Sequence, residues 1–184
     1  MHVLNWGATD ADMTRVMAGD AVLPHPNYET TMAVEIEAEP SHIWPWLVQM
    51  GYRRGGLYSY DWLDRLFGYL DRPSATRVIP ELQRLREGDV IPLGRGPGFT
   101  VRLIDGARAL VLGGADGKRG WIWEFGLYPI GPQRTRLVTR NRLHVPRSWG
   151  WRLFMLAMAP AAFVMTRRML IGIRTRAERL TTET

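Results

Sequence analysis

The amino-acid sequence predicts an α+β fold in which a curved antiparallel sheet packs against one long C-terminal helix. Two observations lead to this prediction. Apolar and polar residues alternate in Thr30–Ala38 and again within 121–145, as they do in strands with one buried face. Residues 148–180 instead carry apolar side chains at helical spacing. Because a half-buried sheet needs cover on its apolar face, we expect the long helix to supply it.

Two helices are predicted directly after the first strand. Ser41 is a suitable N-cap for the first helix, which ends near Gly51, and Pro45 is expected in its first turn, where a missing N–H costs little. The second helix is predicted over Tyr58–Phe67. Its apolar stripe consists of Trp62, Leu63, Leu66 and Phe67.

Five further strands are predicted between residues 89 and 145. Glycine-containing turns separate several of them, and Asp105-Gly106 is typical of a hairpin turn. The predicted strands are Asp89–Leu93, Phe99–Ile104, Ala109–Leu112, Trp121–Ile130 and Thr135–Val145. Short connections of this kind favour antiparallel pairing.

The two ends of the chain complete the expected organisation. Residues 1–29 are predicted to be an extended lead-in with one short helix near Met13–Met17, and residues 30–184 to form a single domain. Pro160 should kink the long helix. The most apolar stretch, Leu153–Met165, has about 13 residues, whereas a bilayer span needs ~20. We therefore expect a buried or interfacial helix there, and not a transmembrane one.

Composition and charge exclude several classes of protein. The 184 residues include no cysteine, which excludes disulfides and thiolate zinc sites. The net charge of +6 is uneven, because residues 1–92 carry −5 and residues 93–184 carry +11. A basic half suits an anionic membrane or an acidic ligand, but no nucleic-acid-binding motif accompanies it. The N-terminus does not have the pattern of a secretory signal, so we expect a cytoplasmic protein.

Several stretches of sequence carry a resemblance to a known superfamily. They are Ile43–Gly51, Gly55–Leu63, Arg77–Gln83, Gly88-Asp89 and Met165–Arg174. On these residues the chain resembles the SRPBCC (START-like, helix-grip) superfamily, which includes lipid-transfer domains and polyketide cyclase/dehydrase-like proteins, and it looks most like an uncharacterised bacterial branch. The resemblance covers about residues 28–178. It implies a helix-grip fold with a cavity between the sheet and the last helix, but no set of catalytic residues.

Strand parity and position select nine candidate ligand-binding residues. Trp121, Trp123 and Phe125 share one strand face, and Thr139 and Asn141 point inward from the next strand, where polar groups need partners. The other candidates are Tyr58, Tyr60 and Trp62 after Gly55-Gly56, and Met165 on the last helix. Ordinary core packing is the alternative interpretation of the aromatic residues and of Met165.

The remaining polar residues are interpreted as structural. Parity sends Arg140 and Arg142 to the outer face, where an exposed cross-strand pair of Glu124 with Arg140 is expected. Asp61 is expected to cap the second helix. The histidines do not stand at metal-ligand spacing, and no G-x-S-x-G, P-loop or dinucleotide motif occurs. We therefore predict no metal, no cofactor and no identifiable catalytic residue.

These observations lead to one preferred function and two alternatives. The chain is expected to bind or carry a small hydrophobic or amphipathic molecule between the sheet and the last helix, without catalysis. The first alternative is a polyketide cyclase/dehydrase-type enzyme, which requires an acid or base inside the cavity. The second alternative is a protein that lies on an anionic membrane surface through its basic C-terminal helix.

Overall fold

The computed structural model describes residues 5–115 and 120–182. Within them, six antiparallel strands form one sheet in the order β1-β6-β5-β4-β3-β2. The strands are β1 (Tyr28–Ile36), β2 (Val90–Ile91), β3 (Phe99–Asp105), β4 (Ala109–Ala115), β5 (Gly120–Gly131) and β6 (Arg134–His144). The predicted hairpin turn at Asp105-Gly106 is confirmed, since it joins β3 to β4. The two long strands β5 and β6 occupy the middle of the sheet and carry most of the candidate residues.

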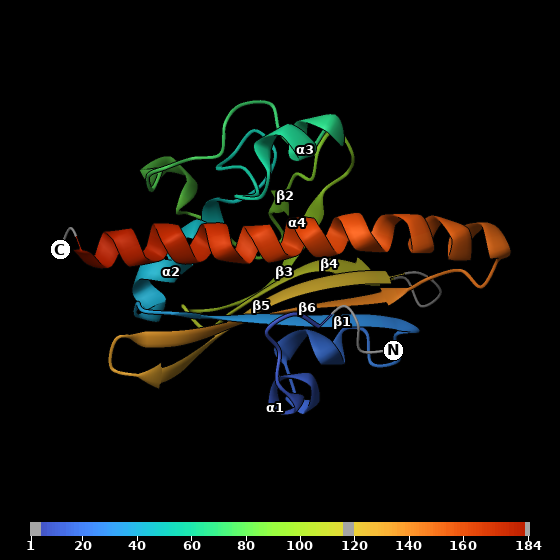
Figure 1. Ribbon diagram of the computed structural model, residues 1–184, viewed down its shortest axis with the longest axis horizontal. Helices are drawn as coiled ribbons and strands as arrows, with labels where there is room; N and C mark the ends of the chain where they lie inside the picture. The colour runs from blue at the N-terminus through green and yellow to red at the C-terminus, as the bar shows by residue number, and fades with distance from the viewer. Residues whose placement is uncertain (1–4, 116–119, 183–184) are drawn as a thin grey trace.

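Four α-helices and two short 3-10 helices complete the described chain. They are α1 (Asp10–Thr14), η1 (Ala18–Ala21), α2 (Pro40–Gln49), α3 (Asp61–Leu66), η2 (Pro80–Leu82) and α4 (Trp149–Thr182). Figure 1 shows α4 lying along one face of the sheet, with α1 on the opposite side. We call these the inner and the outer face. The predicted α+β helix-grip arrangement, a sheet that grips one long helix, is confirmed.

The main hydrophobic core lies between the inner face and the C-terminal half of α4. On α4 the buried residues are Met169, Leu170, Gly172, Ile173 and Ala177. They pack with inward-facing strand residues such as Phe125 and Leu137 and with Trp46 and Leu47 of α2. A Cβ on Gly172 would come within 2.2 Å of the Tyr58 carbonyl oxygen, so glycine is required for this close approach.

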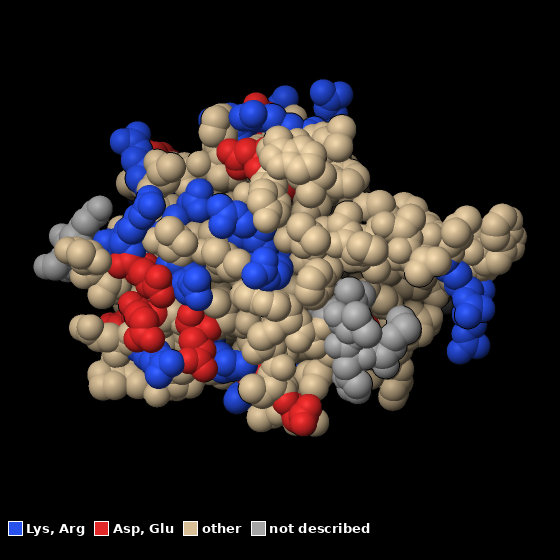
Figure 2. Space-filling model, viewed as in Figure 1, with Lys and Arg blue, Asp and Glu red and all other residues tan. Residues whose placement is uncertain are grey.

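The N-terminal half of α4 extends past this core and is largely exposed. Its exposed apolar residues are Trp149, Trp151, Leu153, Phe154, Leu156 and Val164. In Figure 2 this part of α4, at the right of the molecule, is largely tan, with blue basic side-chain atoms below its end. By length and composition alone, α4 is apolar enough to cross a membrane, and only 11% of its apolar window is buried. Of the two expected placements of Leu153–Met165, the buried one is wrong for this half, and the interfacial one stays a prediction.

The two helices after β1 differ in detail from the prediction. Helix α2 begins at Pro40 with Glu39 at its N-cap, so Ser41 is not the cap and Pro45 lies inside the helix. Helix α3 spans only six residues. Two members of its predicted apolar stripe, Trp62 and Leu66, are exposed, while Asp64 is fully buried.

The segment before β1 covers the outer face of the sheet. The short helix expected near Met13–Met17 lies at Asp10–Thr14, and a capping box of Thr9 and Asp12 closes its N-terminus. Met17 packs with Ala33 and Val138, which point outward from β1 and β6. Both faces of the central strands are therefore covered by the chain itself.

Candidate functional site

A pocket of about 1030 Å³ lies between the inner face of the sheet and the N-terminal half of α4. Strands β1, β5 and β6 form its floor, and α4 forms its roof with Phe154, Met158 and Phe163. The segment around α3 closes one side with Leu57, Ser59 and Asp64. Most of these side chains are apolar, and the methionines among them adapt readily to the shape of a bound molecule.

Trp121 and Trp123 of β5 line the floor of this pocket. The Trp121 ring meets the edge of Phe99 with centroids 4.6 Å apart, and Trp123 lies 5.0 Å from Phe125. Phe125 itself is fully buried in the core and does not line the pocket. The assignment of Trp121, Trp123 and Phe125 to one face of β5 was thus correct. The pocket extends along this face only as far as Trp123.

The two polar candidates on β6 have different surroundings. Asn141 lines the pocket, and its Oδ1 accepts a hydrogen bond of 2.9 Å from Trp121 Nε1. Thr139 is buried and does not line the pocket. Its hydroxyl accepts from Trp123 Nε1 at 3.0 Å and donates to the Glu124 carbonyl oxygen at 2.9 Å. Thr139 therefore holds a pocket residue in place, and its own hydrogen bonds are made within the protein.

The three aromatic candidates near α3 do not line the pocket. Tyr58 is buried, with its hydroxyl donating to the Trp46 carbonyl oxygen at 3.0 Å. Tyr60 and Trp62 are exposed. Met165, the candidate on α4, does line the pocket, as Trp121, Trp123 and Asn141 do. Asp61 does not cap α3 through its side chain, because its carboxylate accepts from Ser74 instead.

A carboxyl group that the sequence analysis passed over lies in the pocket wall. Asp64 is fully buried, and its Oδ1 accepts a hydrogen bond of 2.6 Å from the Ser59 hydroxyl. Among the described residues, its Oδ2 has no hydrogen-bond partner. Burial, together with the charge of Asp61 and despite the Ser59 hydrogen bond, raises the pKa of Asp64 to about 6. The sequence analysis looked for inward polar residues on the strands, whereas Asp64 belongs to the short helix α3, where only the apolar residues were assigned to a face.

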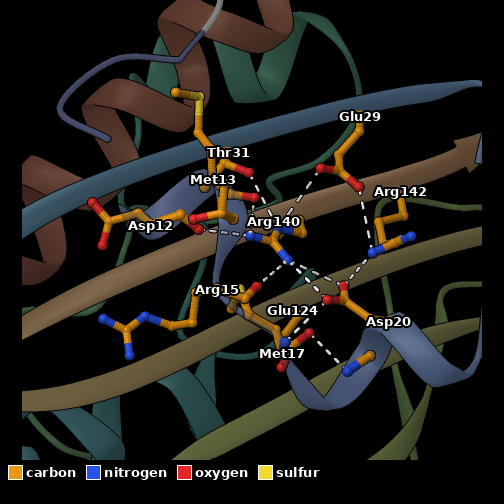
Figure 3. Close-up of polar contacts among 12 residues, drawn as sticks. Asp12, Met13, Arg15, Met17, Asp20, Glu29, Thr31, Glu124, Arg140 and Arg142 are labelled. Carbon is orange, nitrogen blue, oxygen red and sulfur yellow. Dashed lines mark hydrogen bonds and ion pairs between the residues drawn. The ribbon is translucent and has the colours of Figure 1, made fainter. Parts of the chain in front are cut away.

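The outer face holds a cluster of buried charges, shown in Figure 3. Arg140 is 2% exposed and donates to Asp20 at 3.0 Å and to the carbonyl oxygens of Asp12 and Arg15. Glu124 stands opposite Arg140 in the β5–β6 register, but it is also buried, and its Oε2 accepts from the Gly19 N–H at 2.8 Å. The predicted exposed Glu124–Arg140 pair is therefore wrong, because both residues are buried and Arg140 pairs with Asp20. The N-terminal segment covers both residues, which the alternation pattern of the strands does not reveal.

Arg142 joins the same cluster and does not form an anion site. Its guanidinium pairs with the carboxylate of Asp20 and lies 3.4 Å from Glu29. Asp20 thus bridges the two arginines. Within the described residues, no group of three or more histidine, aspartate or glutamate side chains is placed to hold a metal ion.

The chain matches no protein-family model and no curated protein. Among solved structures, it is similar to norcoclaurine synthase from Thalictrum flavum in complex with dopamine and hydroxybenzaldehyde, with 14% identity, TM-score 0.47 and coverage of 92% of this chain and 95% of that one. It is also similar to the Zhui aromatase/cyclase from Streptomyces sp. R1128, with 14% identity, TM-score 0.44 and coverage of 83% and 94%.

A protein from Arthrobacter aurescens gives 14% identity, TM-score 0.47 and coverage of 90% and 92%. Likeness at this level carries no activity or ligand over to this chain. The helix-grip assignment stands on the sheet order and on the position of α4 described above.

Proposed function

We propose that the protein binds a small hydrophobic or amphipathic molecule in the pocket between the sheet and α4. The observation that carries this proposal is the pocket itself, whose volume of about 1030 Å³ is sufficient for a small organic molecule. Apolar side chains dominate the wall, and a few polar groups, among them Asn141 and Asp64, interrupt it. An apolar wall with few polar groups is typical of a small-molecule site.

A substitution that fills the pocket tests this proposal. Ala159 lines the pocket on α4, whereas Ala157, two residues earlier, is exposed and lies outside it. We expect Ala159→Trp to weaken binding of an uncharged dye such as Nile red by about tenfold or more, because the indole occupies the space of the dye. Ala157→Trp is the matched control and should leave the affinity unchanged.

Two results would contradict the proposal. One is a native protein, stripped of bound lipid, that does not bind the dye at all. The other is an equal loss of affinity in both tryptophan variants, which would place the dye on the exposed surface of α4. Native mass spectrometry of protein purified from its own host gives an independent measurement, in which a co-purified small molecule is expected.

The exposed half of α4 supports a second candidate function, docking on an anionic membrane surface. Its apolar residues face solvent, and from Ser148 to Ala177 the only charged side chains are arginines. Arg152 stands within the apolar stretch, and Arg167 and Arg168 follow it. Apolar residues flanked by arginines and tryptophans are typical of helices that lie in the membrane interface.

Co-sedimentation with vesicles tests this candidate. We expect binding to vesicles that contain phosphatidylglycerol, little binding to pure phosphatidylcholine, and a decrease at high salt. Leu153→Gln/Leu156→Gln and Arg167→Ala/Arg168→Ala should each reduce binding, while Leu66→Gln, which removes an exposed leucine of α3, should not. Equal binding by all variants would contradict the candidate. So would a dimer, seen by light scattering, that the double leucine variant dissociates.

A further inference from the structure

The most informative group in the pocket wall is the carboxyl of Asp64. It lies in the interior with no exposed surface, and the pocket touches it. The Ser59 hydroxyl occupies Oδ1, and the described chain provides no donor to Oδ2. A buried carboxyl oxygen without a partner is costly, because it has lost water and gained nothing in exchange.

The surroundings of Asp64 do not neutralise its charge. The interactions that act on it are the hydrogen bond from Ser59 and the negative charge of Asp61, and neither supplies a cation. Asp61 is itself held by Ser74 and cannot turn toward Asp64 without losing those hydrogen bonds. On the outer face, Asp12 and Asp20 each have an arginine partner. Glu124 also leaves one oxygen, Oε1, without a hydrogen-bond partner among the described residues, but it lies beneath the N-terminal segment and does not line the pocket.

The local backbone fixes the carboxyl in this position. The Asp64 N–H donates to the Tyr60 carbonyl oxygen at 2.8 Å, and the Tyr69 N–H donates to the Asp64 carbonyl oxygen at 2.7 Å. Tyr58 adopts a left-handed conformation with φ of 58°, which turns the chain so that Ser59 meets Asp64. Packing thus holds Tyr58 in this strained conformation, and the resulting turn brings the Ser59 hydroxyl to Asp64 Oδ1. Oδ2 is left for another partner.

We propose that the pocket selects an amphipathic molecule whose polar end is a hydrogen-bond donor, and that a protonated amine is the preferred end group. The amine would donate to Asp64 Oδ2 while the apolar part lies between Trp123 and α4. This inference rests on the proposed binding function and specifies its ligand class. A protonated amine supplies both the missing donor and the missing positive charge. A hydroxyl supplies only the donor, and a carboxylate adds a second negative charge.

Three ligands that differ only in their end group test this proposal. Decylamine, decanol and decanoic acid would compete with Nile red on the lipid-free, full-length protein at pH 7.5. We expect decylamine to bind about tenfold more tightly than decanol, because a charge-assisted hydrogen bond is stronger than a neutral one, and decanoic acid to bind most weakly. This ranking needs no variant and therefore does not depend on whether any variant folds.

The variant Asp64→Asn then tests whether Asp64 causes the preference for decylamine. Asparagine keeps the shape and an acceptor for Ser59, but it removes the charge, so the affinity for decylamine should fall about tenfold while that for decanol changes less than about threefold. Asp71→Asn is the control, because it removes one negative charge that pairs with Arg72 outside the pocket. It should leave all three affinities unchanged.

The outcomes separate this inference from the function on which it rests. Equal affinity for the three ligands in the native protein, or an amine preference that survives Asp64→Asn, would overturn the end-group assignment while the pocket still binds. A native protein that binds neither Nile red nor any of the three ligands would overturn the binding function itself.

Discussion

The carboxylates that hold the N-terminal segment on the outer face and the carboxyl in the pocket wall are buried in opposite ways. On the outer face, Asp12 and Asp20 lie against Arg136, Arg140 and Arg142. Glu124 is the exception among the described outer-face carboxylates, because it accepts from the Gly19 N–H and its Oε1 has no hydrogen-bond partner. On the inner face, Asp64 has only the hydroxyl of Ser59. Because buried charges are tolerated when they are paired, the outer cluster is explained by the fold alone. The fold alone does not explain the burial of Asp64. This difference points to a ligand in the pocket as its partner.

The outer cluster binds the N-terminal segment to the sheet. Arg140 reaches the carbonyl oxygens of Asp12, Met13 and Arg15 as well as the carboxylate of Asp20, so one side chain fixes α1 and η1 together. Arg136 adds a bidentate contact to Asp12. We infer that this cluster stabilises the attachment of residues 5–27 and leaves no site for an external anion.

The largest expected effect comes from removing the central arginine of the outer cluster. Arg140→Met keeps much of the apolar stem, but it leaves three carbonyl oxygens without their donor and Asp20 with one arginine partner, Arg142, in place of two. We expect the free energy of unfolding to fall by about 3–5 kcal/mol, as is typical when one partner of a buried pair is removed. Arg134→Ala, which breaks exposed ion pairs with Glu35 and Glu37, is the control and should cost at most about 1 kcal/mol. Urea unfolding measures both, and similar losses would refute the distinction between these two sets of arginines.

The second expected effect is a pH dependence of opposite sign for Asp12 on the outer face and Asp64 in the pocket wall. Burial raises the pKa of Asp12, but the hydrogen bonds from Arg136 and Thr9 outweigh it and lower that pKa from 3.8 to about 2. Ionised Asp12 therefore stabilises the fold above pH 3.8, and this contribution is lost as the pH falls through about 2. Asp64, with its pKa raised to about 6, stabilises the fold below pH 3.8 and loses that contribution as the pH rises through about 6.

Two asparagine variants measure this difference. Relative to the native chain, Asp12→Asn should lower the free energy of unfolding at pH 7 by about 1–2 kcal/mol, and the loss should shrink toward pH 2. Asp64→Asn should raise it by about 1–2 kcal/mol at pH 7.5, and the gain should disappear toward pH 4. Urea unfolding across this pH range checks both, and parallel profiles for the two variants would refute the contrast.

Local patterns in the sequence predict much of this architecture. Alternation located β5 and β6 to within one residue at most ends, because a two-residue period is set by the neighbouring side chains alone. The same parity correctly placed Trp121 and Asn141 toward the pocket and Arg140 away from it. The apolar spacing likewise predicted the long C-terminal helix over residues 148–180, and it lies at Trp149–Thr182.

The features that the local sequence patterns did not predict depend on contacts with distant parts of the chain. Arg140 and Glu124 are buried because residues 5–27 return to cover them, and no local pattern records that return. Asp64 lies in a helix of six residues, too short for its apolar residues to define a face. The exposure of Leu156 depends on where the sheet ends beneath α4, which the helix sequence does not specify.

The smallest expected effect separates a residue that supports the pocket from one that touches a ligand. Thr139→Val removes the acceptor of the buried Trp123 N–H, so the free energy of unfolding should fall by about 1–2 kcal/mol. The affinity for Nile red should stay the same, because Thr139 does not line the pocket. Thr175→Val, at an exposed position of α4, controls for the change in residue type. A loss of dye affinity without a loss of stability would make Thr139 a ligand contact after all and extend the pocket deeper between β5 and β6.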